Sequence, residues 1–278
     1  MIIKLLFLII QIISNNSIFQ NFNKMNQYLM KKLLFKKKYF NPFMDTTKNV
    51  ITISPAGYRG FYEFGVCKYI KENYNLENYI FSGASAGAWN SLFLCYKGDL
   101  NKIEEILFDN TIYNTKTLFE LENTIKNKIL SEFKTDDFDL NKLYIGVTTT
   151  NICKINTIIY NEFSSLEDAV NCCVASSHIP YITGGCKNIY KNALSFDGGF
   201  SIDPYVDTKN SVFKITPNIW NKNQIENQKS SSCYFIPLKI SDYTTVFSRE
   251  YFNFDLMIKY GYYDSEKNKE YLDDIFLY

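Results

Sequence analysis

The sequence predicts an α/β fold with a mostly parallel central sheet. Residues 49–54 and 79–82 are short apolar segments with the composition of buried β-strands, and each is followed by a glycine-containing loop and a segment with helical spacing. A strand-helix-strand-helix opening implies a parallel sheet covered by helices, with ligand sites at the carboxyl ends of the strands. Both glycine-containing loops, residues 55–60 and 83–87, fall at those ends.

The length of 278 residues and the 46% content of hydrophobic residues allow one large domain with a sizeable core. The formal net charge of +1 is segmental, because residues 1–44 hold seven lysines and no acidic residue. The rest of the chain is therefore net acidic, which argues against a nucleic-acid-binding body with a basic face. Residues 1–44 are predicted to form a basic and apolar leader, and residues 45–278 the folded domain.

The leader leaves three interpretations open: a signal, a membrane anchor or a disordered segment. Residues 1–14 form an apolar run that is too short to cross a bilayer comfortably as a helix, which needs about 20 residues. No small-x-small cleavage site follows, and Met25 or Met30 could be the true start. Lysines and aromatic residues interleave over residues 31–40, which suits an anionic lipid surface and is equally typical of a solvated, disordered leader.

The second predicted strand runs into the pentapeptide GASAG, residues 83–87, which has the pattern of a nucleophile elbow. At such an elbow a serine occupies a strained strand-to-helix turn that pushes its hydroxyl out of the sheet, and flanking glycines let neighbouring segments approach. Gly83 and Gly87 fill the flanking positions around Ser85. The helix that begins near Ala86 would direct its amide dipoles at a developing oxyanion. Ser85 is therefore the candidate nucleophile.

A glycine-containing turn after the first strand, followed by GxSxG after the second, resembles the patatin-like phospholipase family. Six residues stand where that family has its G-G-G-x-[RK]-G element, namely Pro55, Ala56, Gly57, Tyr58, Arg59 and Gly60. Pro55 and Ala56 replace two of the family's glycines. Because Pro55 has no N–H group, the resemblance implies an oxyanion hole formed by the amides of Ala56, Gly57 and Ala86.

The helices predicted within residues 100–133 are interpreted as packing or lid elements, and the segments around them are predicted from the same kind of spacing. Helical spacing occurs in residues 61–74, 100–108 and 118–133, and residues 143–149 and 155–160 are typical of adjacent strands, interpreted as a hairpin that turns near residues 151–154. Helical spacing from Leu166 to Cys173 runs into an A-S-x-x-x-P turn that ends at Pro180. This turn resembles the branch of the family that includes adipose triglyceride lipase and adiponutrin, where the segment lies beside the active site.

Residues 195–200, SFDGGF, match the D-G-[GA] motif of the same family. Gly198 and Gly199 let the chain turn sharply at a strand end, so that the carboxylate of Asp197 can face a serine on a neighbouring loop. The resemblance implies a catalytic dyad of Ser85 and Asp197. Further along, residues 213–215 and 233–236 are predicted strands, and residues 249–275 carry the periodicity of one or two closing helices.

A serine-histidine-aspartate triad of the α/β-hydrolase type is a competing interpretation, because that fold also uses GxSxG. There the histidine follows the acid along the chain, whereas the one histidine of this sequence, His178, precedes Asp197. His178 is therefore expected to be a loop residue near the site, with a catalytic role as the alternative.

The resemblance implies a three-layer α/β/α sandwich and a serine esterase that cleaves glycerolipids or phospholipids, through a covalent acyl-enzyme, at a membrane or lipid droplet. No cofactor, metal or nucleic-acid partner is expected. The alternative is a catalytically weak or inactive domain that binds lipid or a protein, and the replacements at Pro55 and Ala56 favour it. Seven cysteines without CxxC spacing favour a reducing compartment. We expect a cytoplasmic protein with peripheral membrane association, or a secreted or membrane-anchored one if residues 1–14 act as a signal.

Overall fold

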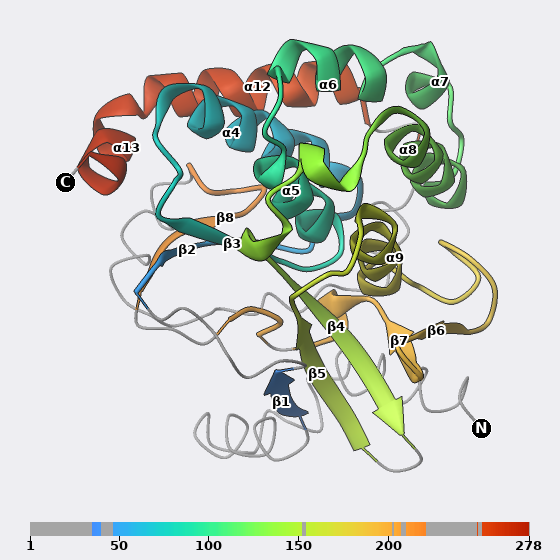
Figure 1. The fold of residues 1–278 in the computed structure, drawn as a ribbon. Coiled ribbons are helices and arrows are strands. Elements are labelled where there is room, and N and C mark those ends of the chain that lie inside the picture. The colour runs from blue at the N-terminus through green and yellow to red at the C-terminus, as the bar shows by residue number, and fades with distance from the viewer. Residues whose placement is uncertain are drawn as a thin grey trace, which may run out of the picture.

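Eight strands form one sheet in the computed structural model, which describes residues 35–39, 47–151, 154–201, 203–206, 210–220, 249 and 252–277. The main path of the sheet runs β1-β5-β4-β3-β2-β8, and β6 and β7 attach beside β4 (Figure 1). The strands are β1 (Phe35–Tyr39), β2 (Asn49–Ile53), β3 (Tyr79–Gly83), β4 (Leu143–Asn151), β5 (Lys154–Tyr160), β6 (Asn188–Tyr190), β7 (Ala193–Phe196) and β8 (Ser211–Ile215).

Four of the five pairings along the main path are parallel, and the pairing of β4 with β5 is antiparallel. The helices lie on one side of the sheet in Figure 1. They are α4 (Gly60–Asn73), α5 (Ala86–Cys95), α6 (Leu100–Leu107), α7 (Asn110–Tyr113), α8 (Leu118–Glu132), α9 (Leu166–Ser176), α12 (Phe254–Lys267) and α13 (Lys269–Phe276). The predicted α/β sandwich with a mostly parallel sheet is confirmed, although the described helices form one layer on the sheet and not the two layers of the predicted α/β/α arrangement.

The order of elements follows the prediction through the motif-bearing part of the chain. β2, α4, β3 and α5 form the expected opening, and β4 and β5 form the expected hairpin. α12 and α13 are the two closing helices. The predicted strand at residues 233–236 lies outside the described residues.

β1 was not predicted, and it lies inside the segment that was assigned to the leader. It pairs in parallel with β5, with Phe35 opposite Ile155 and Tyr39 opposite Ile159. Residues 35–39 thus belong to the sheet, which corrects the boundary at residue 45 for this strand. A single edge strand of five residues has little periodicity of its own, and its partner lies more than a hundred residues away. The role of residues 1–34 and 40–46 stays a prediction, because they lie outside the described residues.

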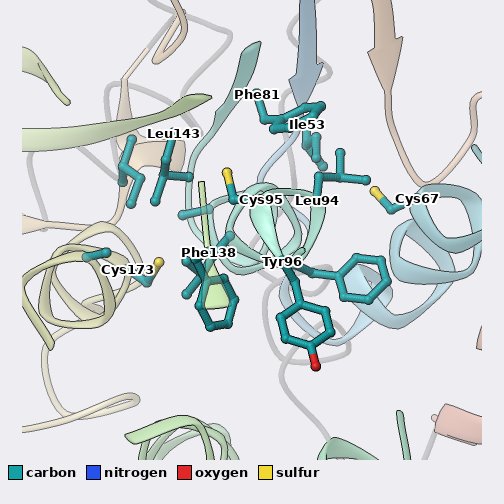
Figure 2. Close-up of a cluster of buried hydrophobic side chains, with 14 of the residues drawn as sticks. Ile53, Cys67, Phe81, Leu94, Cys95, Tyr96, Phe138, Leu143 and Cys173 are labelled. Carbon is teal, nitrogen blue, oxygen red and sulfur yellow. The ribbon is translucent and has the colours of Figure 1, made fainter. Parts of the chain in front are cut away.

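The sheet buries both faces by strand alternation. On the helical side, Ile51 and Ile53 of β2 and Phe81 of β3 join the main core, whereas Val50 and Ile80 belong to a smaller cluster on the other face. Figure 2 shows Leu94 and Cys95 of α5 packed against Ile53, Phe81 and Leu143 of the sheet. Four cysteines are buried in this part of the structure as free thiols: Cys67, Cys95, Cys172 and Cys173. Among the described helices, none is long and apolar enough to span a bilayer.

The first turn of α5 packs against strand backbone without space for a side chain. A Cβ atom on Gly87 would lie 2.2 Å from the carbonyl oxygen of Ile53, and one on Gly83 would lie 2.1 Å from the carbonyl oxygen of Gly87. The flanking glycines of the GASAG motif are therefore packing glycines, which lets α5 begin directly above the ends of β2 and β3.

Gly87→Ala is expected to lower the free energy of unfolding by about 1–3 kcal/mol, because backbone must move to admit the methyl group. Thermal unfolding followed by circular dichroism measures the change. Gly185→Ala is the matched control, since nothing lies within 4 Å of a Cβ atom there. Equal melting temperatures for the two variants would contradict the tight packing of α5.

Candidate active site

Ser85 stands between β3 and α5 in a backbone conformation that favours glycine. Its φ is 54° and its ψ is −127°, which costs a non-glycine residue about 1–3 kcal/mol. The Ser85 N–H donates to Oγ of Ser176 at 2.8 Å, and that hydroxyl donates to the carbonyl of Gly146 at 2.7 Å. α9 and β4 thereby hold the strained turn, as a nucleophile elbow requires.

Asp197 follows β7 and opens the 3₁₀ turn Gly198–Phe200. Its Oδ2 accepts a hydrogen bond from the Ser85 hydroxyl at 2.6 Å, although the two residues are 112 positions apart. Its Oδ1 accepts the N–H of Gly199 at 2.6 Å, and its own N–H donates to the carbonyl of His178 at 2.8 Å. The carboxylate is therefore held on both oxygens and aimed at the candidate nucleophile.

The two glycines of the D-G-G motif have different structural roles. A Cβ atom on Gly198 would lie 2.4 Å from the carbonyl oxygen of Gly146 and 2.7 Å from Cβ of Ala84, so Gly198 lets the turn reach the elbow. Gly199 supplies the N–H that binds Asp197.

Burial sets the acid-base character of the dyad. Asp197 is 5% exposed, and desolvation raises its pKa to about 6, against the opposing hydrogen bonds from Ser85 and Gly199. A carboxylate with a raised pKa is a stronger base than a solvent-exposed aspartate, yet it is still ionised at neutral pH. The pair can therefore transfer a proton from the serine to the aspartate.

A cavity of about 130 Å³ opens beside the dyad and is lined by Ser85 and Asp197. Most of its other walls are apolar side chains from the helices that cover the sheet. They include Phe61, Phe93, Ile103, Leu107, Leu121 and Ile125. A largely apolar cavity with polar groups at the reacting end suits an acyl chain bound next to a nucleophile.

The amino-terminal ends of two helices meet at this cavity. α4 begins at Gly60 and α5 begins at Ala86, and both residues line it together with Gly57. A Cβ atom on Gly60 would lie 2.6 Å from Cβ of Ala86, so glycine permits the close approach. Gly57 has a φ of 55°, which favours glycine at this position of the loop. The helix dipoles make this end of the cavity favourable for negative charge.

The other residues of the predicted oxyanion loop lie elsewhere. Tyr58 is buried against Phe252 and Phe254, and Arg59 is exposed. Ala56 does not line the cavity, and its carbonyl accepts the Arg59 N–H at 3.1 Å. The structure thus brings Gly57, Gly60 and Ala86 to the site, and not Ala56, Tyr58 or Arg59.

His178 lies next to the site through its backbone rather than its ring. Its carbonyl accepts the Asp197 N–H, and its side chain does not line the cavity. Burial lowers the pKa of its imidazole, which keeps the ring neutral. This placement agrees with the expected loop residue, and among the described residues no hydrogen bond joins the ring to Ser85 or Asp197.

Two residues of the site were not found by sequence reasoning. Ser176 lies in the recognised A-S-x-x-x-P turn, but its bond to the Ser85 amide depends on tertiary contact. Glu122 lines the cavity from α8. The sequence feature that could have identified Glu122 is its position, a carboxyl group next to an apolar helical stripe formed by Leu118, Leu121, Ile125 and Ile129.

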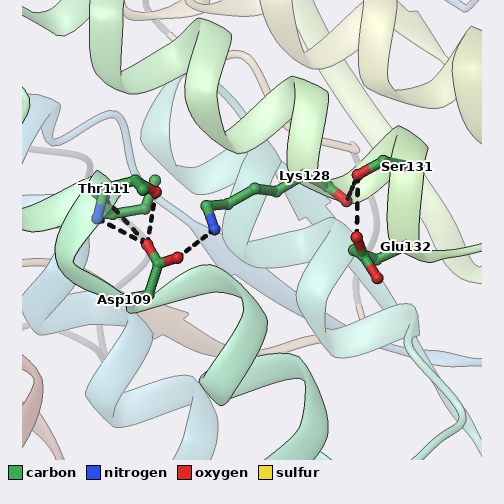
Figure 3. Close-up of polar contacts among 6 residues, drawn as sticks. Asp109, Thr111, Lys128, Ser131 and Glu132 are labelled. Atoms are coloured by element: carbon green, nitrogen blue, oxygen red, sulfur yellow. Dashed lines mark hydrogen bonds and ion pairs between the residues drawn. The ribbon is translucent and has the colours of Figure 1, made fainter.

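An ion pair, a hydrogen bond and an N-cap hold α8 over the cavity. Lys128 of α8 pairs with Asp109, whose other oxygen accepts from the backbone and hydroxyl of Thr111 (Figure 3). Lys126 donates to Asn171 of α9 at 2.8 Å, and Thr117 caps the first turn of α8. These contacts keep the apolar stripe of α8 turned to the cavity.

Comparison with known proteins is consistent with this geometry. The model of the family described as patatin-like phospholipase matches residues 51–207, which include the loop after β2, the elbow and Asp197. The chain is similar to 1-acylglycerol-3-phosphate O-acyltransferase Pnpla3 of Mus musculus, with 22% identity over 173 residues. The match covers 58% of this chain and 42% of that protein, so the chain spans less than half of this relative.

Proposed function

This chain belongs to the patatin-like phospholipase family of lipid hydrolases and acyltransferases, and from this premise we propose that it cleaves carboxylic esters of glycerolipids or phospholipids with a Ser85–Asp197 dyad. The observation that carries the proposal is the 2.6 Å hydrogen bond between the hydroxyl of Ser85 and the carboxylate of Asp197. Both residues line the apolar cavity, and Ser85, the donor of this hydrogen bond, has a strained backbone conformation.

The proposed reaction proceeds in two steps. Asp197 accepts the hydroxyl proton as Ser85 attacks the ester carbonyl, and the proton then passes to the leaving alcohol as the acyl-enzyme forms. Water attacks the acyl-enzyme in the second step, and Asp197 again accepts and returns a proton. The N–H groups of Gly57 and Ala86 are the proposed donors to the oxyanion, because both residues line the cavity beside Ser85.

The proposed substrates are glycerolipids at a membrane or lipid-droplet surface, reached by peripheral association. The apolar cavity supports a lipid acyl group, and the mouse relative is named as an acyltransferase of an acylglycerol phosphate.

The activity is expected to follow the ionisation of Asp197. Because the pKa of Asp197 is raised to about 6 and only the ionised carboxylate can accept the serine proton, kcat/KM should fall about tenfold per pH unit below pH 6. The measurement uses the purified full chain with a fluorogenic acyl ester between pH 4 and 9. Re-assay at pH 7.5 after each incubation separates this loss from unfolding.

His178→Asn is the control for this acidic limb, since the ordinary pKa of histidine, about 6.5, lies close to the expected midpoint of the limb. The limb should persist in that variant. Activity that stays constant down to pH 4 would contradict the role of Asp197 as the base.

A second candidate function rests on Pro55. This residue removes one N–H from the loop that supplies oxyanion donors in the family, which favours a domain that binds lipid without efficient turnover. Binding of lipid vesicles without hydrolysis of any acyl ester at pH 8 would favour this second candidate over the first.

A further inference from the structure

One carboxyl group interrupts the apolar wall of the cavity. Glu122 of α8 lines the cavity between Leu121 and Ile125 and is 9% exposed. A carboxyl group in apolar surroundings costs free energy unless hydrogen bonds compensate for the lost water. An aliphatic residue at this position would continue the apolar stripe of α8 without this cost. The presence of a carboxyl group therefore suggests that it has a function.

Glu122 is tied to the elements that hold the dyad. Its Oε1 is hydrogen-bonded to the hydroxyl of Ser177, which also receives the indole N–H of Trp89 at 3.1 Å. Ser177 follows Ser176, the residue that binds the Ser85 amide, and Trp89 lies on the first turns of α5. Asp197 is near enough for its charge to raise the pKa of Glu122. The carboxyl group therefore lies close to the reacting end of the cavity.

Burial favours a neutral Glu122, and the hydrogen bonds around Ser177 are compatible with a protonated carboxyl group. The Ser177 hydroxyl has one proton and also contacts the carbonyl of Cys173 at 2.7 Å. If the Ser177 hydroxyl donates its proton to the carbonyl of Cys173, its oxygen can accept from the indole N–H of Trp89 and from a protonated Glu122. In that arrangement all three groups, the hydroxyl, the indole and the carboxyl group, use their protons in hydrogen bonds. Burial raises the pKa of Glu122 to about 8, while Ser177, Trp89 and Lys126 oppose this shift. Lys126 is itself bonded to Asn171.

Acceptor capacity remains on Glu122 after these contacts. A carboxyl group has about four lone-pair positions when ionised and keeps acceptor sites when protonated, and Ser177 and Trp89 occupy at most two of them. Since the residue lines the cavity, the remaining capacity is available to a bound molecule. A neutral acid attracts a hydrogen-bond donor rather than a cation.

We propose that Glu122, held by Ser177 and Trp89, is an acceptor subsite for a hydroxyl group close to the scissile ester. This inference rests on the proposed ester hydrolysis. The hydroxyl can come from the alcohol side, as in a partial glyceride or lysolipid, or from the acyl side, as in a 2-hydroxyacyl ester. In either case, a substrate without the hydroxyl leaves a buried polar group unpaired, which disfavours it.

The test compares matched ester pairs with the purified full chain. One pair is a monoacylglycerol and its di-O-methyl ether, and the other is a 2-hydroxyacyl ester and its 2-methoxy counterpart. The wild-type chain should prefer the hydroxyl member of one pair by about tenfold in kcat/KM, the scale of one buried hydrogen bond. The pair that shows the preference identifies the side of the ester that carries the hydroxyl.

Three variants locate this preference. Glu122→Leu should reduce the ratio to about one, and Glu122→Gln, which keeps an acceptor oxygen, should retain most of it. Glu132→Leu makes the same change at an exposed position of α8 and should keep the wild-type ratio. Melting temperatures show that each variant is folded. Leucine continues the apolar stripe at position 122 and is therefore expected to fold.

Binding of the same four compounds to Ser85→Ala provides a second readout that does not need turnover. If the wild-type chain hydrolyses no ester but Ser85→Ala binds the hydroxyl members more tightly in a Glu122-dependent way, the proposed function fails and the subsite stands. If hydrolysis depends on Ser85 but the ratios of wild type and Glu122→Leu are equal, the subsite is wrong. A Glu122-dependent preference for choline esters instead of hydroxyl compounds also overturns it.

Discussion

Ser85→Ala is expected to abolish ester hydrolysis, lowering kcat/KM by about 10³-fold or more, because the acyl-enzyme can no longer form. The rest of the site should be preserved, since the elbow is held through the Ser85 backbone amide by Ser176 and through the glycine packing of α5. A fluorophosphonate probe should label the wild-type chain at Ser85 and leave Ser85→Ala unlabelled.

Ser85→Gly separates catalysis from strain at the same position. Glycine is equally inactive, but it adopts a φ of 54° without the strain that a side chain causes. After the backbone entropy of glycine is subtracted, the free energy of unfolding should increase by about 1 kcal/mol. The melting temperature should therefore rise. Ser85→Ala keeps the strain and should melt close to wild type. A lower melting temperature for Ser85→Gly would mean that the serine hydroxyl stabilises the fold.

The same variants test the lipid substrate. Expression of wild type and Ser85→Ala in matched cells, followed by lipidomics, should show depletion of one glycerolipid class and release of its fatty acid in the wild type alone. In the probe experiment, fluorophosphonate labelling that is unchanged in Ser85→Ala would show that another residue is the nucleophile. Identical lipid profiles would favour the lipid-binding candidate.

Asp197→Asn is expected to lower kcat/KM by about 10²-fold or more, since an amide cannot accept the serine proton. Asparagine has nearly the same shape, and its amide oxygen can still accept the N–H of Gly199. Labelling of Ser85 by the fluorophosphonate should slow by a similar factor. Asp274→Asn, an equal change at an exposed position of α13, should match the wild type in both assays.

Stability at neutral pH should not decrease in Asp197→Asn. The pKa of Asp197 in the folded chain is raised above 3.8, the ordinary value for aspartate that applies to the unfolded chain. Protonation of Asp197 therefore stabilises the fold, and this contribution is fully present below about pH 3.8. That contribution is lost as the pH rises through about 6, which leaves a buried charge at pH 7. A neutral amide removes this cost, so the melting temperature at pH 7.5 should equal or exceed that of wild type. A large decrease would assign Asp197 a structural role instead.

Local pattern was sufficient for much of the fold. The helical spacing of α4 and α9, and the β4–β5 hairpin, were predicted because apolar residues recur in these segments with the spacing of a helix or a strand. The elbow was predicted because its glycines and serine are adjacent in the chain. β1 was missed because an edge strand is chosen by its distant partner β5 and not by its own period.

The sequence by itself determined the α/β class, the elbow at Ser85 and the candidate acid Asp197, because these depend on short motifs and on hydrophobic period. Only the tertiary structure decided how the site is assembled. It brings Asp197 to 2.6 Å from Ser85, selects Gly57 and Ala86 rather than Ala56 at the cavity, and turns Glu122 inward. The physical reason is that burial and hydrogen-bond partners come from segments far apart in the chain, and these also set the pKa of each carboxyl group.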